Sequence, residues 1–331
     1  MENKYSNKYL IETGMGLQDV DGLKNSSYFI QESERYIRGE ISLEELDSII
    51  SSYYKNKPDD EATNKEADVV SKNIAKILSD DSFTFTVGQL ISIHKQLFDE
   101  VFVHAGQLRT YNFTKKEWVL DGASVWYGDY RELETALQYD FDNERKFVYI
   151  RLSMDEIMEH LAVFIANLWQ IHPFEEGNTR TTAVFTIKYL RSLGFDVTND
   201  SFAKNAWYFR NSLVRANYKH LRKGVFEDRS FLIKFLRNLL LGEKNPLHNR
   251  ELHVSTVSSS INNTKEARII NVIAKNPKIK TDEMAIELGV SLRTVKSLIA
   301  TLVKDNKIKR VNGKKYGYWE VQQRKCVLKL P

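Results

Sequence analysis

The chain has 331 residues, of which 42% are hydrophobic, so it is long enough for two or three domains with buried cores. Its net charge of +4 does not by itself indicate a nucleic-acid-binding protein, and its single cysteine, Cys326, excludes a disulfide framework or a cysteine-based zinc site. No apolar run approaches the roughly 20 residues of a membrane span, and no secretory signal opens the chain, so we expect a cytoplasmic protein without membrane contact.

Apolar residues recur mostly at three- and four-residue spacing, which predicts a mainly helical fold. The clearest N-terminal helix follows Ser42, where Glu45 completes a capping box. Pro58 lies in a polar loop that ends this first block. A segment rich in Ser, Asn and Thr predicts a linker later in the chain. The expected parts are a helical module over 1–56, a central helical domain over 69–242, a linker over 243–264 and a compact domain over 265–325.

Residues 112–129, NFTKKEWVLDGASVWYGD, predict a β-hairpin in the central domain. Two short apolar segments, 117–120 and 123–127, flank Asp121 and Gly122. An Asp-Gly pair favours the two-residue turn of a hairpin.

The segment IHPFEEGNTR, residues 171–180, lies between two predicted helices. The first begins at Ser153 with a second capping box and ends near Trp169, before His172 and Pro173. The second runs from the end of the segment to Gly194. A glycine-containing loop at a helix N-terminus presents free backbone N–H groups and a positive dipole to an anion. The pattern therefore predicts a site for nucleotide phosphates.

This loop also contains the groups that phosphoryl or nucleotidyl transfer needs. His172 titrates near neutral pH and can take a proton from a hydroxyl group. Glu176 offers a carboxylate oxygen to Mg²⁺, which shares its coordination shell with phosphates. Asn178 can orient a phosphate oxygen, and Arg180 can bind one bidentately. The alternative is a buried helix–loop–helix whose polar side chains only satisfy backbone groups. We expect that structural role for the isolated histidines His94, His104 and His160.

The sequence HPFEEGNTR closely resembles the HPFx(D/E)GNGRxxR signature of the Fic family, and the resemblance extends roughly over residues 89–215. Fic proteins transfer AMP from ATP to protein hydroxyl groups. The resemblance implies a helical Fic bundle in which His172 is the general base, Glu176 binds Mg²⁺ and Arg180 binds the nucleotide phosphates. It also implies an anion hole formed by Gly177, Asn178 and Thr179.

Two positions depart from the signature. Thr179 replaces the usual glycine, which is expected to stiffen or narrow the loop. Ala183 stands where the second arginine of the signature is expected, and that arginine helps to hold the terminal phosphate. The identity and orientation of the nucleotide donor therefore stay open.

Fic proteins carry a flap before the motif, which pairs with the target chain near the acceptor hydroxyl by adding an edge strand. The resemblance places this flap on the predicted hairpin, and a purely structural hairpin is the alternative. Arg109 matches the arginine before the flap, or it forms a plain salt bridge. The helix after the motif helps to enclose adenosine in the family, although an aromatic stripe is also typical of a core helix. The residues concerned are Glu117, Trp118, Val119 and Leu120 in the flap, and Tyr208, Asn211 and Arg215 in the helix.

Residues 17–54 resemble the VbhA-type antitoxin module that accompanies many Fic domains, and the match rests on the segment RYIRGEISLEEL. Such modules carry an inhibitory (S/T)xxxE(G/N), whose glutamate pairs with the second arginine and blocks productive ATP binding. Alignment on the segment places Asp21 at the glutamate and Leu17 at the Ser/Thr position. Because aspartate is shorter and its partner position is Ala183, we expect this restraint to be weak or rebuilt. The module could act within its own chain, across a homodimer, or only as a structural lid.

The C-terminal domain is expected to contain three helices followed by a hairpin. Thr281 begins the second helix, Gly289 ends it, and Ser291 caps the third. Asn312 and Gly313 predict the hairpin turn. The order resembles a winged helix-turn-helix, whose third helix enters the major groove of DNA while the wing contacts phosphates. A protein-docking surface or a solvated basic face is the alternative. The candidate DNA-binding residues are Arg293, Thr294, Lys296 and Lys314.

Three functions fit these features. The first is a protein adenylyltransferase that uses ATP and Mg²⁺ to modify a Ser, Thr or Tyr hydroxyl of a target protein, or of itself, and releases pyrophosphate. The second is a DNA-binding regulator whose Fic domain senses nucleotide without turnover. The third is a Fic transferase with another donor such as UTP, or one that transfers phosphate. The intact His172 and Glu176 favour the first over the second, and Ala183 keeps the third open.

Overall fold

The computed structural model describes residues 4–55, 64–221, 225–254, 269–270, 272–274, 276–305, 307–311 and 317–322. The chain divides into two compact units, Met1–Val254 and Ser255–Pro331, and each has its own hydrophobic core. Within the described ranges, no helix is both long and apolar enough to cross a membrane.

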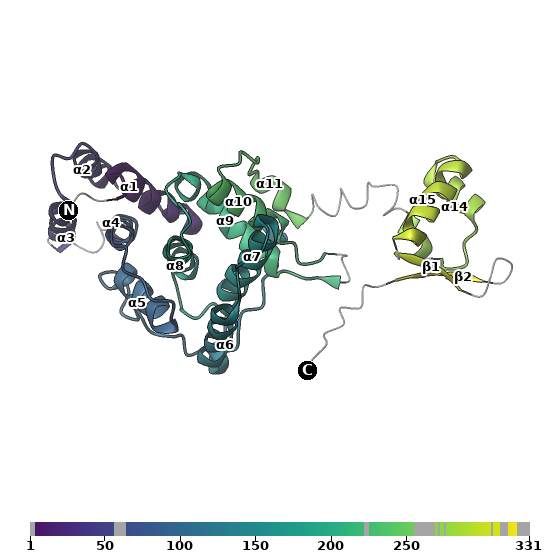
Figure 1. Ribbon diagram of the computed structural model, residues 1–331, viewed down its shortest axis with the longest axis horizontal. Coiled ribbons are helices and arrows are strands. Elements are labelled where there is room, and N and C mark those ends of the chain that lie inside the picture. Colours follow the sequence, from purple (N-terminus) through teal and green to yellow (C-terminus); the bar gives the residue numbers. More distant parts are fainter. Residues whose placement is uncertain are drawn as a thin grey trace. The chain divides into compact units, whose positions relative to one another are not determined.

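The first unit is built from helices (Figure 1). The α-helices up to the motif are α1 Asn7–Gly16, α2 Ser27–Ile37, α3 Leu43–Lys55, α4 Lys65–Ser79, α5 Val87–Phe98, α6 Leu133–Lys146 and α7 Met154–Ile171. Those after it are α8 Asn178–Ser192, α9 Ser201–Asn217, α10 Ser230–Leu241 and α11 Asn249–Leu252. The short 3-10 helices are η1 Leu17–Asp21, η3 Trp118–Leu120 and η4 Tyr130–Glu132.

The mainly helical prediction is confirmed, and so are both capping boxes. The Ser153 hydroxyl accepts a hydrogen bond from the Glu156 backbone, whose carboxylate accepts one from the Ser153 backbone in return. Ser42 and Glu45 form the same reciprocal pair before α3. Helix α4 begins at Lys65, earlier than the predicted domain start, and its first turn carries acidic residues that favour a helix N-terminus.

Helix α8 lies at the centre of the first unit and contacts α4, α5, α7 and η1 (Figure 1). Every residue from Asn178 to Leu190 is buried, so the helix has no solvent-facing side over most of its length. A helix surrounded in this way is fixed by packing on all sides. The loop that enters it is therefore attached to the most rigid part of the fold.

The N-terminal helices share the core of the first unit. Helix α1 packs against α4 and α9, and two glycines allow the close approach. A Cβ atom at Gly16 would lie 2.1 Å from the Ala203 carbonyl oxygen, and one at Gly14 would lie 2.4 Å from the Ser71 carbonyl oxygen. The buried Asp68 carboxylate on α4 accepts hydrogen bonds from the Ser26 backbone and from the Tyr54 hydroxyl. The N-terminal helices are thus joined to α4 by packing and by buried hydrogen bonds.

The hairpin predicted over 117–127 is wrong in its strands. Asp121 and Gly122 do form the expected turn with positive φ angles, but the residues before them form η3. Val119 and Leu120 are consecutive and both buried, which an alternating strand cannot achieve. Glu117 is buried as well, and of the four predicted flap residues only Trp118 is exposed. An edge strand for peptide pairing is therefore absent from this described segment.

His94 on α5 supports the loop before α8. Its Nδ1 atom accepts a hydrogen bond of 2.8 Å from the Gly106 backbone, so the proton must reside on Nε2. Nε2 then donates to the Glu176 carbonyl oxygen at 3.1 Å, and the ring stacks on Phe174 with centroids 3.8 Å apart. Burial lowers the pKa of His94 to about 4. The structural role predicted for this histidine fits a permanently neutral ring.

The second unit contains α14 Thr281–Leu288, α15 Leu292–Lys304 and an antiparallel hairpin of β1 Ile308–Val311 and β2 Tyr318–Val321. Gly289 ends α14 in a left-handed conformation, and the Ser291 hydroxyl accepts a hydrogen bond from the Thr294 backbone, both as predicted. The predicted turn at Asn312 and Gly313, and Lys314 with it, lie outside the described residues. Part of the predicted linker, residues 255–264, also lies outside them, whereas α11 belongs to the first unit.

The neutral state of His94 predicts acid sensitivity. The unfolded chain protonates this histidine near pH 6.5, whereas the folded protein resists protonation down to about pH 4. The free energy of unfolding should therefore decrease by up to about 1.4 kcal/mol per pH unit as the pH falls through this window. Urea unfolding of the wild type and of His94→Gln at about pH 7 and about pH 5 measures the effect. Glutamine keeps a donor for the Glu176 carbonyl but does not titrate, so equal pH dependence in both proteins would contradict the assignment.

Candidate functional site

The loop from His172 to Gly177 joins α7 to α8. His172 caps α7 with a left-handed backbone, φ 52° and ψ 58°, and Gly177 caps α8 with φ 72°. Phe174 is buried between them and anchors the loop in the core. A left-handed backbone is unfavourable for a residue with a Cβ atom and persists only where its surroundings hold it. The environment of His172 must therefore supply that restraint.

Arg109 supplies this restraint through hydrogen bonds to backbone carbonyls. It is buried, and its guanidinium donates to the carbonyl oxygens of His172 and Tyr111, each at 2.7 Å. It also donates to the Asn112 side chain at 3.1 Å and to the Gly128 carbonyl oxygen. No carboxylate of the described chain forms an ion pair with it, so the plain salt bridge allowed by the sequence is not what holds Arg109. Its charge instead faces backbone dipoles at the C-terminal end of α7, where a cation is favoured.

The His172 ring is enclosed by aromatic side chains. It stacks on Tyr127 with centroids 3.8 Å apart, Trp169 meets it edge-on, and only 3% of the residue is exposed. Burial and then the charge of Lys115 hold the pKa of His172 well below its ordinary value. Nδ1 lies 3.2 Å from the Trp169 carbonyl oxygen, which can only accept, so Nδ1 carries the proton. Nε2 therefore keeps its lone pair, as a general base requires.

Glu176 is half-exposed, and one of its carboxylate oxygens lies 2.9 Å from the Lys115 ammonium group. Within the described residues, no three His, Cys, Asp or Glu side chains gather as a metal site. A single carboxylate nevertheless fits Mg²⁺ in a nucleotide site, because this ion takes most of its ligands from water and phosphate oxygens. Glu176 could take that role once Lys115 moves away from it.

The predicted phosphate-binding residues form the first turn of α8. A Cβ atom at Gly177 would lie 2.3 Å from the Phe98 ring, so only glycine fits there. The Asn178 side chain accepts from the Phe174 backbone at 2.9 Å and donates to the Phe174 carbonyl at 2.7 Å. Its amide therefore closes the loop, and only its backbone N–H faces the anion position at the helix start. The Thr179 hydroxyl accepts from the Trp169 indole at 2.9 Å, which ties α8 to α7.

Arg180 is 1% exposed, and its guanidinium is surrounded by acceptors from η1 and from the first turn of α4. Its guanidinium lies 2.9 Å from the Asp21 carboxylate and 2.6 Å from that of Glu66. The Gln18 side chain accepts a further hydrogen bond of 3.1 Å. Asp21, predicted as a regulatory residue, thus contacts the first arginine of the motif within one chain, while Ala183 lies in the core. Glu66 and Gln18 were not identified from the sequence, because no spacing rule connects them to the motif.

The three candidate adenosine contacts lie on α9, and all are buried. Asn211 donates to the Asn249 side chain at 2.8 Å, which connects α9 to α11. The Tyr208 hydroxyl and two guanidinium nitrogens of Arg215 have no hydrogen-bond partner in the described part of the chain. On the same helix, Arg210 forms a bidentate ion pair with Glu117 at 2.6 and 3.0 Å. The adenosine role of these residues stays a prediction.

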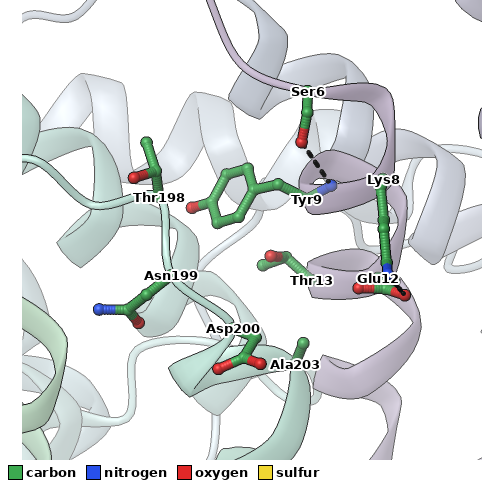
Figure 2. Close-up of a pocket in the computed structure, with 9 residues that line it drawn as sticks. All are labelled: Ser6, Lys8, Tyr9, Glu12, Thr13, Thr198, Asn199, Asp200 and Ala203. Carbon is green, nitrogen blue, oxygen red and sulfur yellow. Dashed lines mark hydrogen bonds and ion pairs between the residues drawn. The ribbon is translucent and has the colours of Figure 1, made fainter. Parts of the chain in front are cut away.

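Figure 2 shows a separate hollow of about 370 Å³ between α1 and the start of α9. Tyr9 points from α1 toward Thr198 and Asn199 on the other wall. No residue of the motif lines this hollow. The hollow lies where α1 packs against α9, and none of the candidate catalytic or phosphate-binding residues lines it.

Two curated relatives are similar to this chain. Protein adenylyltransferase VbhT of Bartonella schoenbuchensis is 26% identical over 117 residues, which is 35% of this chain and 23% of that protein. Probable protein adenylyltransferase y4lH of Sinorhizobium fredii is 26% identical over 126 residues, 38% of this chain and 62% of that protein. The chain thus matches less than two thirds of the length of either relative. A Fic domain containing signaling protein from Bacteroides thetaiotaomicron aligns structurally at 13% identity, with a TM-score of 0.46 over 77% of this chain and 88% of that chain.

Two family models match the chain in separate segments. Residues 84–190 match the Fic/DOC family, and this range contains the His172 loop, His94 and Arg109. Residues 263–309 match the winged helix-turn-helix DNA-binding family, and this range contains α14 and α15. The chain therefore contains a Fic/DOC domain, followed by a winged helix-turn-helix domain at its C-terminal end.

Proposed function

We propose that this protein transfers AMP from ATP to a Ser, Thr or Tyr hydroxyl group of a target protein. The observation that carries the proposal is the neutral His172, whose Nε2 lone pair lies on the loop that begins α8. Helix N-termini bind phosphate, so a base and an anion site lie on one rigid loop. Similarity to two proteins named as adenylyltransferases supports the same reaction class.

In the proposed reaction, His172 Nε2 takes the proton of the acceptor hydroxyl while the hydroxyl oxygen attacks the α-phosphorus of ATP. The bond between the α-phosphorus and the bridging oxygen to the β-phosphate breaks, and pyrophosphate leaves. Backbone N–H groups at the start of α8 would hold the α-phosphate oxygens, and Arg180 would bind the phosphate chain. Glu176 would hold Mg²⁺, which neutralises phosphate charge when bound.

The ion pairs of Arg180 affect how ATP could bind in the proposed reaction. ATP must replace two carboxylates to reach the guanidinium, because Asp21 and Glu66 both contact the same nitrogen. We infer that these two carboxylates restrain nucleotide binding. In the resembling modules the inhibitory glutamate pairs with the second arginine of the motif, which is Ala183 here, so the restraint would act on the first arginine, Arg180, instead. A buried arginine without an anionic partner is strongly unfavourable. Once both carboxylates have moved away, a phosphate of the nucleotide would take their place and neutralise the Arg180 charge.

The transfer reaction predicts a specific labelling pattern. The wild type, incubated with Mg²⁺, lysate and ATP labelled at either the α- or the γ-phosphate, should transfer label from the α-phosphate only. His172→Ala should lose at least about 100-fold of this activity, because it removes the base. His248→Ala, a histidine outside the motif, serves as the matched control and should retain activity. Label from the γ-phosphate would indicate phosphate transfer, and no label from ATP or UTP would favour a nucleotide-sensing regulator instead.

The restraint on Arg180 predicts a non-additive mutant series. Asp21→Asn alone should raise labelling less than about threefold, because Glu66 still holds the guanidinium. Asp21→Asn combined with Glu66→Gln should raise it at least about tenfold and should increase the thermal stabilisation by ATP without hydrolysis. Glu45→Gln, a carboxylate remote from Arg180, provides the control. A large rise in Asp21→Asn alone, or no rise in the double variant, would contradict shared restraint.

A second proposed activity is DNA binding by the winged helix-turn-helix domain. Arg293, Lys296 and Ser297 are exposed on α15, and the Ser291 cap fixes the start of this helix. Thr294, the other candidate on this turn, is partly buried, and its hydroxyl lies 2.8 Å from that of Ser291. Two basic side chains near the N-terminal end of a third helix match the position that reads the major groove in this fold.

DNA binding predicts a salt-dependent affinity that requires these side chains. Arg293→Ala with Lys296→Ala should weaken binding to duplex DNA by at least about tenfold and should reduce the slope of log affinity against log salt. Lys8→Ala with Lys234→Ala removes the same charge from the first unit and should change neither. Absent binding, or binding independent of salt, would favour a protein-docking role for the domain.

A further inference from the structure

A second hollow, of about 410 Å³, is lined by two residues that adjoin His172, Tyr127 and Ile171. Tyr127 stacks on the His172 ring, and Ile171 precedes His172 in the chain. A group bound in the hollow would therefore contact residues that adjoin the base. The lining comes from the segment after η3, from α6 and from the end of α7: Trp126, Tyr127, Gly128, Ala136, Tyr139, Asp140, Asn167, Gln170 and Ile171.

Two walls of this hollow, the 126–128 segment and the end of α7, are joined by hydrogen bonds. The Gly128 backbone donates to the Gln170 carbonyl oxygen at 3.2 Å, and the Gln170 side chain donates to the Trp126 carbonyl oxygen at 3.2 Å. Arg109 also donates to the Gly128 carbonyl, so the clamp on His172 holds this wall as well. These two walls are therefore tied by hydrogen bonds to the segments that also hold His172.

Two aromatic side chains at the hollow are unusually exposed. Trp126 is 83% exposed and Tyr139 is 67% exposed, although most aromatic residues of this unit are buried. Within the described residues, neither ring has an aromatic or cationic partner. Exposed aromatic faces attract ammonium and guanidinium groups because of their negative quadrupole.

Asp140 is the single charged residue among those that line the hollow. No hydrogen bond or ion pair of this carboxylate is found in the described chain, and burial raises its pKa to about 6. A carboxylate that is partly removed from water and unpaired gains from a nearby cation. Aromatic faces and an unpaired carboxylate together favour a positively charged occupant over a neutral or acidic one.

We propose that the Trp126–Tyr139–Asp140 hollow binds a basic side chain, lysine or arginine, of the protein whose hydroxyl is modified. The role of the hollow in target selection rests on the proposed transfer reaction, whereas its binding of a basic side chain does not. A basic side chain in the hollow would place the adjoining target segment next to Tyr127 and the base. The hollow would then select targets by a basic residue near the acceptor hydroxyl.

Binding can be measured without catalysis. The probes are Nα-acetyl-lysine amide and Nα-acetyl-arginine amide, with the norleucine amide as the neutral control. The protein is labelled with fluorotryptophan, and the Trp126 resonance among the five tryptophans is assigned with Trp126→Phe. At least one basic probe should shift the Trp126 resonance and leave that of Trp118, the internal control, unchanged. Asp140→Asn should raise the concentration for half-maximal shift by about tenfold, whereas Asp142→Asn, a carboxylate on α6 that pairs with Arg145, should not.

A shift with the norleucine amide, or equal binding in Asp140→Asn and wild type, would overturn the inference. In the transfer assay, acceptor peptides with a basic residue should have a lower KM than norleucine peptides in the wild type and in Asp142→Asn, but not in Asp140→Asn. A basic probe that binds to a protein without transfer activity would contradict the proposed function and support the hollow. Transfer activity without probe binding and without a KM difference would support the proposed function and contradict the hollow as a binding site.

Discussion

The site depends on one backbone constraint, the left-handed conformation of His172 held by Arg109. A histidine in this conformation is unfavourable in isolation, and the guanidinium offsets this by donating to the His172 carbonyl and to carbonyls on both sides of the flap segment. The same five-donor group therefore fixes the base, the end of α7 and the wall formed by Gly128. Lysine could not replace it, because an ammonium group lacks the planar fork that spans these acceptors. A change at Arg109 would consequently alter both the position of the His172 base and the backbone segments around it.

Arg180 illustrates a different constraint, the cost of a buried charge. It lies in the first turn of α8, where the helix dipole disfavours a cation, and almost none of it reaches solvent. Two carboxylates, one from η1 and one from the first turn of α4, stabilise it in this state. η1 and α4 therefore both neutralise the charge that would bind a nucleotide in the proposed reaction, and both contacts form within one chain. The ion pairs that stabilise the buried Arg180 in the folded protein therefore also keep its guanidinium from a nucleotide phosphate.

The sequence predicted what depends on local spacing. Both capping boxes, the helix stops at Gly194 and Gly289 and the helical architecture follow from neighbouring residues, and they are confirmed. The predicted strands of the flap are wrong, although the turn between them is right. Burial of both Val119 and Leu120, with the ion pair from Glu117 to Arg210, overrides the local strand pattern. Glu66 and the contacts of Arg109 with the His172 and Gly128 carbonyls could not be predicted, since they join segments far apart in the chain. The phosphate-binding role of Asn178 stays a prediction; the hydrogen bonds of its side chain to the Phe174 backbone are a contact that its residue type does not indicate.

Three contacts hold the functional groups in this structure: two come from residues 112–129, and the third comes from η1 and α4 together. Tyr127 lies on His172, Lys115 on Glu176, and the Asp21–Glu66 pair on Arg180. Two of the three are electrostatic, and one ligand can replace both, because a nucleotide phosphate with its cation offers an anion to Lys115 and Arg180 and a cation to Glu176. Tyr127 stacks on the face of the imidazole, whereas the Nε2 lone pair lies in the plane of the ring, so this contact orients the base without blocking it. In the proposed reaction, nucleotide binding would therefore have to release the ion pairs of Glu176 and Arg180, whereas the base would need no such release.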